Sequence, residues 1–412
     1  MATVARKAID LVMKNIKEYN IDCGFSERPA YIFSRDDKQT KELEDIYKAS
    51  EKAGCEVKYS DTLTVPIDFE KVMIVERQAQ FHPSKYFYAL AKAFEDAGGA
   101  LIQDCRVTGI KENDILEIES TLGKINARQI VYATHVPPGV NLLHFRCAPY
   151  RSYVMAIKLR DKNYPNGLAY DMYDPYHYYR TQEADGERYL IAGGEDHKTA
   201  HEENTEACFT RLEGYLRKYF DIEEISFRWS SQYYESTDGL PYIGQLPGHT
   251  DNIFVATGFG GNGITYSQVA AMVLTDIIVE GKSKYEKLFN PARIKPVAGF
   301  TNFVKESADV VGILAGQWFS SSKIKEVTEL AKGEARVVKY EGHSIALFKD
   351  DDGNLHAVNP ACTHIKCIVE WNTAEKTWDC PCHGSRFSVD GEMFTAPARK
   401  NLEKIELGEI KE

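Results

Sequence analysis

Two short loops near the C-terminus carry cysteine and histidine at spacings that suit metal binding. The first loop holds Cys362 and His364 in the pattern Cys-x-His, and the second holds Cys380 and His383 in the pattern Cys-x-x-His. Two thiolates and two imidazoles can hold an iron–sulfur cluster in which two cysteines bind one iron and two histidines bind the other. Neutral imidazoles carry less negative charge than thiolates, so such a cluster is easier to reduce than one held by four cysteines. The pattern therefore predicts a [2Fe–2S] electron-transfer site.

A tetrahedral zinc site is the rival interpretation, because cysteine and histidine at close spacing also bind zinc. Zinc motifs usually place two cysteines together and then two histidines. Here the two residue types alternate along the chain. The alternation favours the iron–sulfur cluster and leaves zinc as the alternative.

The residues around these ligands resemble those of the Rieske domain family. The first loop reads Cys-Thr-His, and the second reads Cys-Pro-Cys-His-Gly-Ser-Arg-Phe and is followed by Asp390-Gly391. The resemblance implies that the cluster ligands are Cys362, His364, Cys380 and His383. It also implies a disulfide between Cys367 and Cys382, and Ser385 as a hydrogen-bond donor to the cluster sulfurs. A disulfide that closes a short loop contributes on the order of 3 kcal/mol to stability.

Length and charge limit the classes of protein to which this chain can belong. Its 412 residues predict two or three domains at ~150 residues each. A net charge of −11, with no run of basic residues, argues against binding to nucleic acid. No apolar run approaches the ~18 residues that a membrane span requires. Residues 1–19 have the periodicity of an amphipathic helix and lack the apolar stretch and cleavage site of a signal peptide, so we expect a cytoplasmic protein.

Proline and glycine interrupt the periodic pattern between residues 290 and 323 and predict a linker over residues 291–322. The linker separates an N-terminal domain, residues 1–290, from a C-terminal domain, residues 323–412. In the C-terminal domain we expect short strands over residues 335–340, 344–349 and 355–358, and a hairpin over residues 368–379. This domain is therefore expected to be a small all-β domain that carries the ligand loops.

A second informative stretch lies in the larger domain. Gly258, Gly260 and Gly263 satisfy the pattern G-x-G-x-x-G between an apolar strand over residues 252–257 and a helix over residues 264–280. A dinucleotide-binding unit would also need a following strand that ends in an acidic residue, and none follows this helix. The turn still presents backbone N–H groups and the positive end of a helix, which suit an electron-rich ligand edge such as a flavin ring. A glycine-rich turn without a ligand is the alternative.

The stretch Thr-Asp-Gly-Leu-Pro-Tyr-Ile-Gly over residues 237–244, together with the glycine turn, resembles the flavin-binding part of the D-amino-acid-oxidase and glycine-oxidase-like FAD oxidoreductases. Further segments agree with that family: a helix that opens at residues 81–83 and runs through residue 97, a buried strand over residues 130–135, and the segments at residues 149–153 and 189–198. The resemblance implies an α/β (α+β) flavoprotein domain with a mixed substrate-binding sheet. It implies that the following residues contact FAD: Thr134, Gly239, Pro241, Gly244, Gly258, Gly260, Gly261 and Gly263. The combination with a C-terminal Rieske domain resembles one bacterial and archaeal subgroup of these flavoproteins.

One departure from that family concerns the N-terminus. Members of the family hold the FAD pyrophosphate and ribose with an N-terminal β-α-β unit that carries G-x-G-x-x-G. Here the sequence begins in a predicted helix, and no glycine fingerprint precedes Gly98-Gly99. We therefore expect a flavin domain that is incomplete at its N-terminus, either because the sequence is truncated or because a second polypeptide supplies the missing unit. If nothing fills the gap, this domain should bind FAD poorly.

These motifs predict an oxidoreductase that passes electrons between a flavin-oxidised substrate and an external acceptor or donor through the [2Fe–2S] cluster. The substrate is an unidentified small molecule, and no catalytic residue is identified. Arg151 and Arg180 could bind a substrate carboxylate through a bidentate fork, and surface salt bridges explain them equally well. The alternative is a Rieske electron carrier or redox sensor with a vestigial flavin domain and no substrate turnover.

Overall fold

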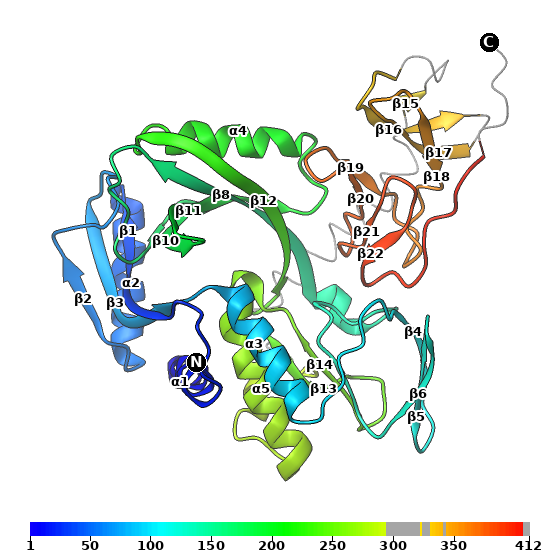
Figure 1. Cartoon of the computed structure of the whole chain (residues 1–412), viewed down its shortest axis with the longest axis horizontal. Coiled ribbons are helices and arrows are strands. Elements are labelled where there is room, and N and C mark those ends of the chain that lie inside the picture. Colours follow the sequence, from blue (N-terminus) through cyan, green and yellow to red (C-terminus); the bar gives the residue numbers. More distant parts are fainter. Residues whose placement is uncertain (294–321, 324–329, 341–342, 407–412) are drawn as a thin grey trace.

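The larger part of the chain is built around one mixed eight-stranded sheet. We use a computed structural model, which describes residues 1–293, 322–323, 330–340 and 343–406 (Figure 1). The strand order is β12-β8-β11-β10-β9-β1-β3-β2, and only β1 and β9 run parallel. The strands are β1 (Ser26–Ser34), β2 (Val57–Ser60), β3 (Lys71–Gln80), β8 (Cys147–Leu159), β9 (Leu168–Asp171), β10 (Tyr178–Ala184), β11 (Glu187–Lys198) and β12 (Ile222–Ser236).

Side chains alternate between the two faces of this sheet, as the pleat requires. On β8, Tyr153 and Met155 belong to a buried core with Leu212 of helix α4 (Thr205–Leu216), which covers this face. The intervening residues of β8, such as Ser152, point to the opposite face. Helix α2 (Asp37–Lys52) packs beside β1, β2 and β3.

A second layer faces the large sheet across the molecule (Figure 1). It contains a three-stranded sheet of order β13-β14-β7, with β13 (Tyr242–Gln245), β14 (Ile253–Thr257) and β7 (Ile130–Tyr132). Helix α5 (Gly263–Glu280) packs on β13 and β14, and α1 (Ala2–Glu18) packs on α5 through Val4 and Ala8. Helix α3 (Pro83–Asp96) begins after His82, as predicted. The smaller elements are β4 (Val107–Lys111), β5 (Leu116–Ser120), β6 (Gly123–Ala127), η1 (Leu142–Arg146), η2 (Gly260–Asn262) and α6 (Glu286–Phe289).

The strand at residues 130–135 differs from the prediction. We expected a buried strand over all six residues, but β7 ends at Tyr132 and Val131 is 40% exposed. The reason is its position, because β7 pairs with β14 and lies at the edge of its sheet among the residues that the structure describes.

The smaller part of the chain is all β and contains two four-stranded sheets. One has the order β15-β16-β17-β18, and the other has the order β19-β20-β21-β22. The strands are β15 (Ser322–Lys323), β16 (Ala335–Tyr340), β17 (His343–Lys349), β18 (Leu355–Val358), β19 (Glu370–Asn372), β20 (Thr377–Asp379), β21 (Arg386–Phe387) and β22 (Met393–Thr395). The predicted strands and the hairpin are therefore confirmed. Most of the predicted linker, residues 291–322, lies outside the described residues.

None of the helices in the described ranges is both long and apolar enough to cross a membrane.

Candidate cluster and flavin sites

The two ligand loops have the same local geometry. In the first, the N–H of Lys366 donates to the carbonyl of Cys362 at 3.0 Å, and in the second the N–H of Gly384 donates to the carbonyl of Cys380 at 2.9 Å. Lys366 (φ 69°) and Gly384 (φ 72°) both adopt the left-handed conformation that turns the chain back. The structure joins the loops by a disulfide between Cys367 and Cys382, with a Cα–Cα distance of 6.5 Å.

The four candidate cluster ligands lie together where the loops meet. Cys362 and Cys380 are fully buried, and a hydrogen bond with the Cys380 thiol lowers the pKa of Cys362 while burial opposes the shift. The rings of His364 and His383 lie 4.9 Å apart at 82°. All four of their ring nitrogens are buried without a hydrogen-bond partner in the described structure. Unpartnered buried nitrogens are unfavourable unless a ligand satisfies them, so this donor set fits a cluster held by two cysteines and two histidines.

Protonation and hydrogen bonding agree with this fit. Burial lowers the pKa of His364 to about 4 and that of His383 to about 3, which keeps both rings in the neutral form that binds metals. Ser385 is fully buried, and its hydroxyl contributes a further hydrogen bond to the Cys362 sulfur. The sulfurs of Cys367, Cys380 and Cys382 also lie within 4.8 Å of one another, but the disulfide removes two of them as thiolate ligands.

A histidine that the sequence reasoning missed covers the two candidate histidine ligands. The ring of His144, in η1, lies 4.8 Å from that of His364 and 5.7 Å from that of His383. Its Nδ1 accepts the N–H of Asn141 at 3.2 Å, so its Nε2 carries the proton and donates to the carbonyl of Pro137 at 2.8 Å. Burial lowers the pKa of His144 to about 4, which keeps the ring neutral. The spacing Asn-x-x-His, which resembles a capping box, is the local signal that could have identified it.

The structure corrects one of the two proposed substrate arginines. Arg151 is 1% exposed and is bound to the smaller β region, with its guanidinium 3.3 Å from the Asp379 carboxylate and donating to Ser230 Oγ at 2.6 Å. Its side chain is on the α4 face of the large sheet, alongside Tyr153. Arg151 is therefore a structural ion-pair partner, because its buried guanidinium faces Asp379 with one nitrogen and Ser230 with another.

The glycine turn joins β14 to α5 and opens onto free space. Gly258 (φ 71°) and Gly260 (φ 56°) are left-handed. A Cβ on Gly258 would lie 3.2 Å from Cys147 Sγ, whereas at Gly260 and Gly263 nothing would lie within 4 Å. At Gly261 the nearest atom would be the Tyr176 hydroxyl, 3.2 Å away. A turn with glycine on its open side and helix N–H groups beyond it fits the edge of a flavin ring.

Of the other predicted flavin residues, some lie in loops near this turn and one lies inside a strand. Thr134 follows β7, and the Thr257 hydroxyl donates to the carbonyl of His135 at 2.6 Å, which ties the neighbouring ends of β7 and β14 together. Gly239 and Pro241 lie in the loop before β13. Gly244 pairs with Val255 inside the β13–β14 ladder, and a Cβ there would meet Pro291.

Arg293 fixes that loop and was not recognised from the sequence. Its guanidinium binds both carboxylate oxygens of Asp238, at 2.6 and 2.8 Å, and donates to the carbonyls of Leu240 and Pro241. The side chains of Arg293 and Asp238 are only 7% and 5% exposed. Arg293 also lies over the ring of Tyr242, 4.0 Å from its centroid. No local pattern marks Arg293, because its partners lie about fifty residues earlier in the chain.

A cavity of about 330 Å³ lies between the first turn of α5 and the large sheet. Arg180 and Tyr170 of the sheet line it, together with Gln80, Asn262 and Thr265. The guanidinium of Arg180 donates to Gln182 at 2.6 Å. A cationic side chain in a hollow beside the glycine turn is suited to a substrate carboxylate.

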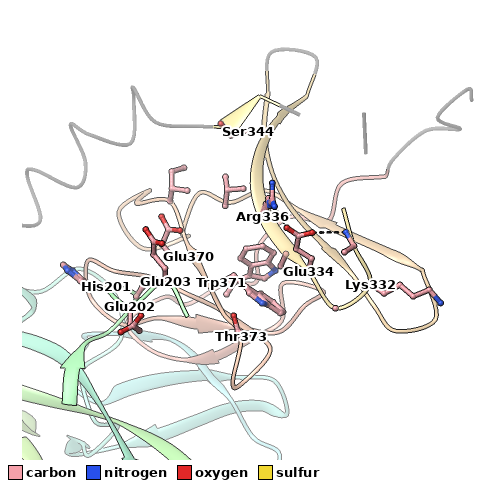
Figure 2. A pocket seen from close by; sticks show the side chains of 17 residues that line it. His201, Glu202, Glu203, Lys332, Glu334, Arg336, Ser344, Glu370, Trp371 and Thr373 are labelled. Atoms are coloured by element: carbon pink, nitrogen blue, oxygen red, sulfur yellow. Dashed lines mark hydrogen bonds and ion pairs between the residues drawn. The ribbon is translucent and has the colours of Figure 1, made fainter. Parts of the chain in front are cut away.

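An acidic hollow of about 900 Å³ lies between the loop after β11 and the smaller β region (Figure 2). Glu203 and Glu370 face it, and burial, with added repulsion from Glu203, raises the pKa of Glu370 to about 7. Trp371 and Trp378 also line it, and Trp378 belongs to the same buried core as Cys362 and Cys380. The hollow therefore reaches the core that surrounds the candidate cysteine ligands.

Comparisons with known proteins identify the family of each of the two regions. Residues 1–277 match the FAD dependent oxidoreductase family (DAO), and residues 320–406 match the Rieske [2Fe-2S] domain. YhfW of Bacillus subtilis (strain 168), whose name describes a Rieske 2Fe-2S iron-sulfur protein, is 32% identical over 405 residues, 98% of this chain and 79% of that protein. The cytochrome b6-f complex iron-sulfur subunit of Chlorobaculum tepidum is 39% identical over 101 residues, 22% of this chain and 56% of that subunit.

Solved structures resemble the larger part of the fold. Glycine oxidase from Geobacillus kaustophilus superposes with a TM-score of 0.60 at 18% identity, covering 71% of this chain and 82% of that chain. L-proline dehydrogenase from P. horikoshii gives a TM-score of 0.59 at 18% identity, with 70% and 82% covered. The predicted fold class, a mixed α/β flavoprotein fold with a small β-rich C-terminal region, is confirmed.

The chain belongs to the FAD dependent oxidoreductase family and carries a C-terminal Rieske [2Fe-2S] domain. The family implies FAD, and the domain implies a [2Fe–2S] cluster. Below, the larger part of the chain is called the flavoprotein domain and the smaller part the Rieske domain.

Proposed function

We propose that this protein oxidises a small carboxylate-bearing substrate and passes the electrons, through its Rieske cluster, to an external acceptor. The observation that supports this most directly is that one strand, β12, contacts both candidate cofactor sites. Glu235 of β12 forms a bridge with Phe259 of the glycine turn, and the neighbouring Tyr234 donates a hydrogen bond to the carbonyl of His383 at 3.2 Å. The two candidate sites are thus linked through adjacent residues.

Each cofactor would be held by residues described above. Cys362, Cys380, His364 and His383 would bind the cluster, and the turn from Gly258 to Gly263 would receive the flavin ring. When bound, FAD accepts a hydride from the substrate and the cluster accepts electrons one at a time. The chain's own part is to orient the reactants, with Arg180 as the proposed partner of the substrate carboxylate and the N-terminal end of α5 favouring negative charge on the ring.

The external acceptor is proposed to approach the acidic hollow. His144 and the flavoprotein sheet cover the histidine end of the cluster site, whereas Trp378 links the hollow to the core around the cysteines. Four glutamates in its wall, including Glu203 and Glu370, outnumber Lys332 and Arg336, so the hollow suits a cationic acceptor over an anionic one. Substituting both glutamates by glutamine should slow reduction of a cationic acceptor and leave an anionic one unaffected or faster.

Anaerobic purification followed by assays of iron, acid-labile sulfide and flavin tests the main proposal. Two irons with stoichiometric flavin, and an electron paramagnetic resonance signal that appears when a small amino or imino acid is added, would support it. Two irons without flavin would favour the electron carrier or redox sensor without substrate turnover. Zinc in a colourless protein would refute both functions.

A further inference from the structure

We infer that the Rieske domain is held in one fixed position on the flavoprotein sheet, and that Tyr234 and Gln232 of β12 position its ligand loop for electron transfer across that strand. The inference rests on the proposed function for the direction of electron flow, but the docking itself is independent of it. Three sets of contacts between the two domains support it.

The first set of contacts holds the ligand loop by its backbone. Gln232 Nε2 donates to the carbonyl of Gly384 at 2.8 Å and to the hydroxyl of Tyr234 at 3.1 Å. The Tyr234 hydroxyl in turn donates to the carbonyl of His383. Both β12 side chains are buried, and burial raises the pKa of Tyr234, so its hydroxyl remains a donor. The carbonyls of two consecutive residues, His383 and Gly384, are therefore held by one strand of the other domain.

The closeness of the two surfaces is set by a glycine. A Cβ on Gly384 would lie 2.7 Å from Pro149 Cβ and 2.7 Å from Gln232 Nε2. These separations are shorter than any van der Waals contact, so even one methyl group would push the domains apart. Two features therefore favour glycine at position 384: its left-handed φ and the close contact of its backbone with the flavoprotein sheet.

The second set of contacts is a buried polar network at the residue before Cys380. Asp379 binds Arg151 of β8 from the flavoprotein side, and Arg386 and Asn372 from its own domain, at 3.3, 3.2 and 2.9 Å. Glu375 accepts from Ser230 of β12 at 2.6 Å. Buried charged pairs of this kind favour one geometry over others, because a displaced partner leaves a desolvated charge.

The third set of contacts lies on the other side of the ligands. The N–H of Gly139 donates to the carbonyl of Pro397 at 2.8 Å, and Arg399 donates to the carbonyl of Pro138 at 3.0 Å. On the α4 side, the Thr205 hydroxyl donates to Asn372 Oδ1 at 2.9 Å. Contacts from separate segments thus surround the loop and oppose rotation about any one of them.

This docking defines a short route across the sheet. Successive side chains of β12 point to opposite faces, so Tyr234 points toward the Rieske domain and Glu235 points away from it. Because Glu235 is the residue bridged to Phe259 of the glycine turn, one peptide separates the β12 residue that contacts the cluster loop from the one that contacts the glycine turn. A Rieske domain held in one position keeps the distance between the two candidate cofactor sites constant, whereas a domain that moved would change it.

Hydrogen–deuterium exchange of the cluster-loaded full chain tests the docking. Tyr234→Phe removes one hydroxyl and should speed exchange over residues 380–386 about fivefold, the factor expected from one ordinary hydrogen bond. Arg151→Met should speed it on the order of a hundredfold, because it removes one partner of a buried charged pair. Tyr86→Phe is the matched control, since Tyr86 is also fully buried and hydrogen-bonded, to Asn15, far from the dock. It should leave exchange in residues 380–386 unchanged.

Two results would overturn the inference. One is small-angle scattering that shows the two domains of the unmodified protein at variable separation. The other is unchanged exchange in both Tyr234→Phe and Arg151→Met while their cluster spectra stay normal. If Arg151→Met does not fold, Tyr234→Phe, which deletes a single oxygen, decides the question alone.

Flavin-to-cluster electron transfer, followed by stopped flow, separates this inference from the proposed function. Slower transfer in Tyr234→Phe at an unchanged rate of flavin reduction supports a positioning role. An equal transfer rate in wild type and variant would refute that role and leave the proposed function intact. If the wild-type flavin never reduces the cluster, the proposed function fails, and the exchange result then applies to the docking alone.

Discussion

The two candidate cofactor sites are built in different ways. The cluster ligands come from two loops that are close in sequence, share one turn geometry and are joined by the Cys367–Cys382 disulfide. The flavin-side residues come from the ends of β7 and β14, the start of α5 and a loop fixed by Arg293 from farther along the chain. The cluster site is therefore local, whereas the flavin site depends on several distant segments. A substitution at the cluster site should therefore affect nearby residues, whereas a substitution at the flavin site should also affect distant segments.

The largest expected effect tests the local character of the cluster site. Cys362→Ser removes a thiolate, which a hydroxyl does not replace for iron, so the cluster should be lost completely. Iron content and the electron paramagnetic resonance signal of the reduced protein measure this. Cys105→Ser, a free cysteine elsewhere in the chain, is the control and should keep full iron. A loaded cluster in Cys362→Ser would show that the ligand assignment is wrong.

The next effect tests how far the flavin side depends on distant contacts. Arg293→Met should lower the free energy of unfolding by about 3–5 kcal/mol, because it removes the guanidinium from a buried charged pair with Asp238. Denaturant unfolding measures this change. Arg217→Met breaks an exposed pair with Glu213 and should change stability by less than about 1 kcal/mol. Equal effects of the two variants would argue against Arg293 as the fixing residue.

The disulfide should make a comparable but smaller contribution, limited to the Rieske domain. Replacing both Cys367 and Cys382 by serine should lower its stability by about 3 kcal/mol, since the bond closes a loop with a separation of 15 residues. Thermal unfolding followed by cluster absorbance reports on this domain. The double substitution of the free Cys55 and Cys105 is the control. Loss of stability in the flavoprotein domain as well would show that the contacts between the domains couple their unfolding.

The smallest expected effect is a pH dependence at the acidic hollow. The pKa of Glu370 is raised to about 7 in the folded protein from an ordinary 4.5, so the folded state binds more protons between these values. Stability should therefore fall as the pH rises from about 4.5 to 7, and Glu370→Gln should remove this part of the slope. Because the Glu370 residue is exposed to solvent, the change should be small. Thermal midpoints of both proteins across this pH range provide the test, and parallel curves would contradict it.

Residue spacing alone determined much of the chain's local structure. The strands near residues 335–340, 344–349 and 355–358, the hairpin between the ligand loops, and the helix that begins after His82 all follow from nearby residues. Motif resemblance likewise indicated the family and the domain that the comparisons confirm. These features depend on contacts within one turn, one ladder or one loop, so a short window of sequence contains their cause.

Only the tertiary structure decided what Arg151, His144, Arg293 and β7 do. Arg151 was predicted to meet a substrate, yet it meets Asp379, which lies 228 residues away in sequence. His144 covers the candidate ligands, and β7 is an exposed edge, because of how separate segments pack. Spacing thus determined which residues could hold the cluster, while long-range packing decided which face of the cluster site meets the flavoprotein sheet. The physical reason is that burial and ion pairing are properties of surfaces that meet after folding.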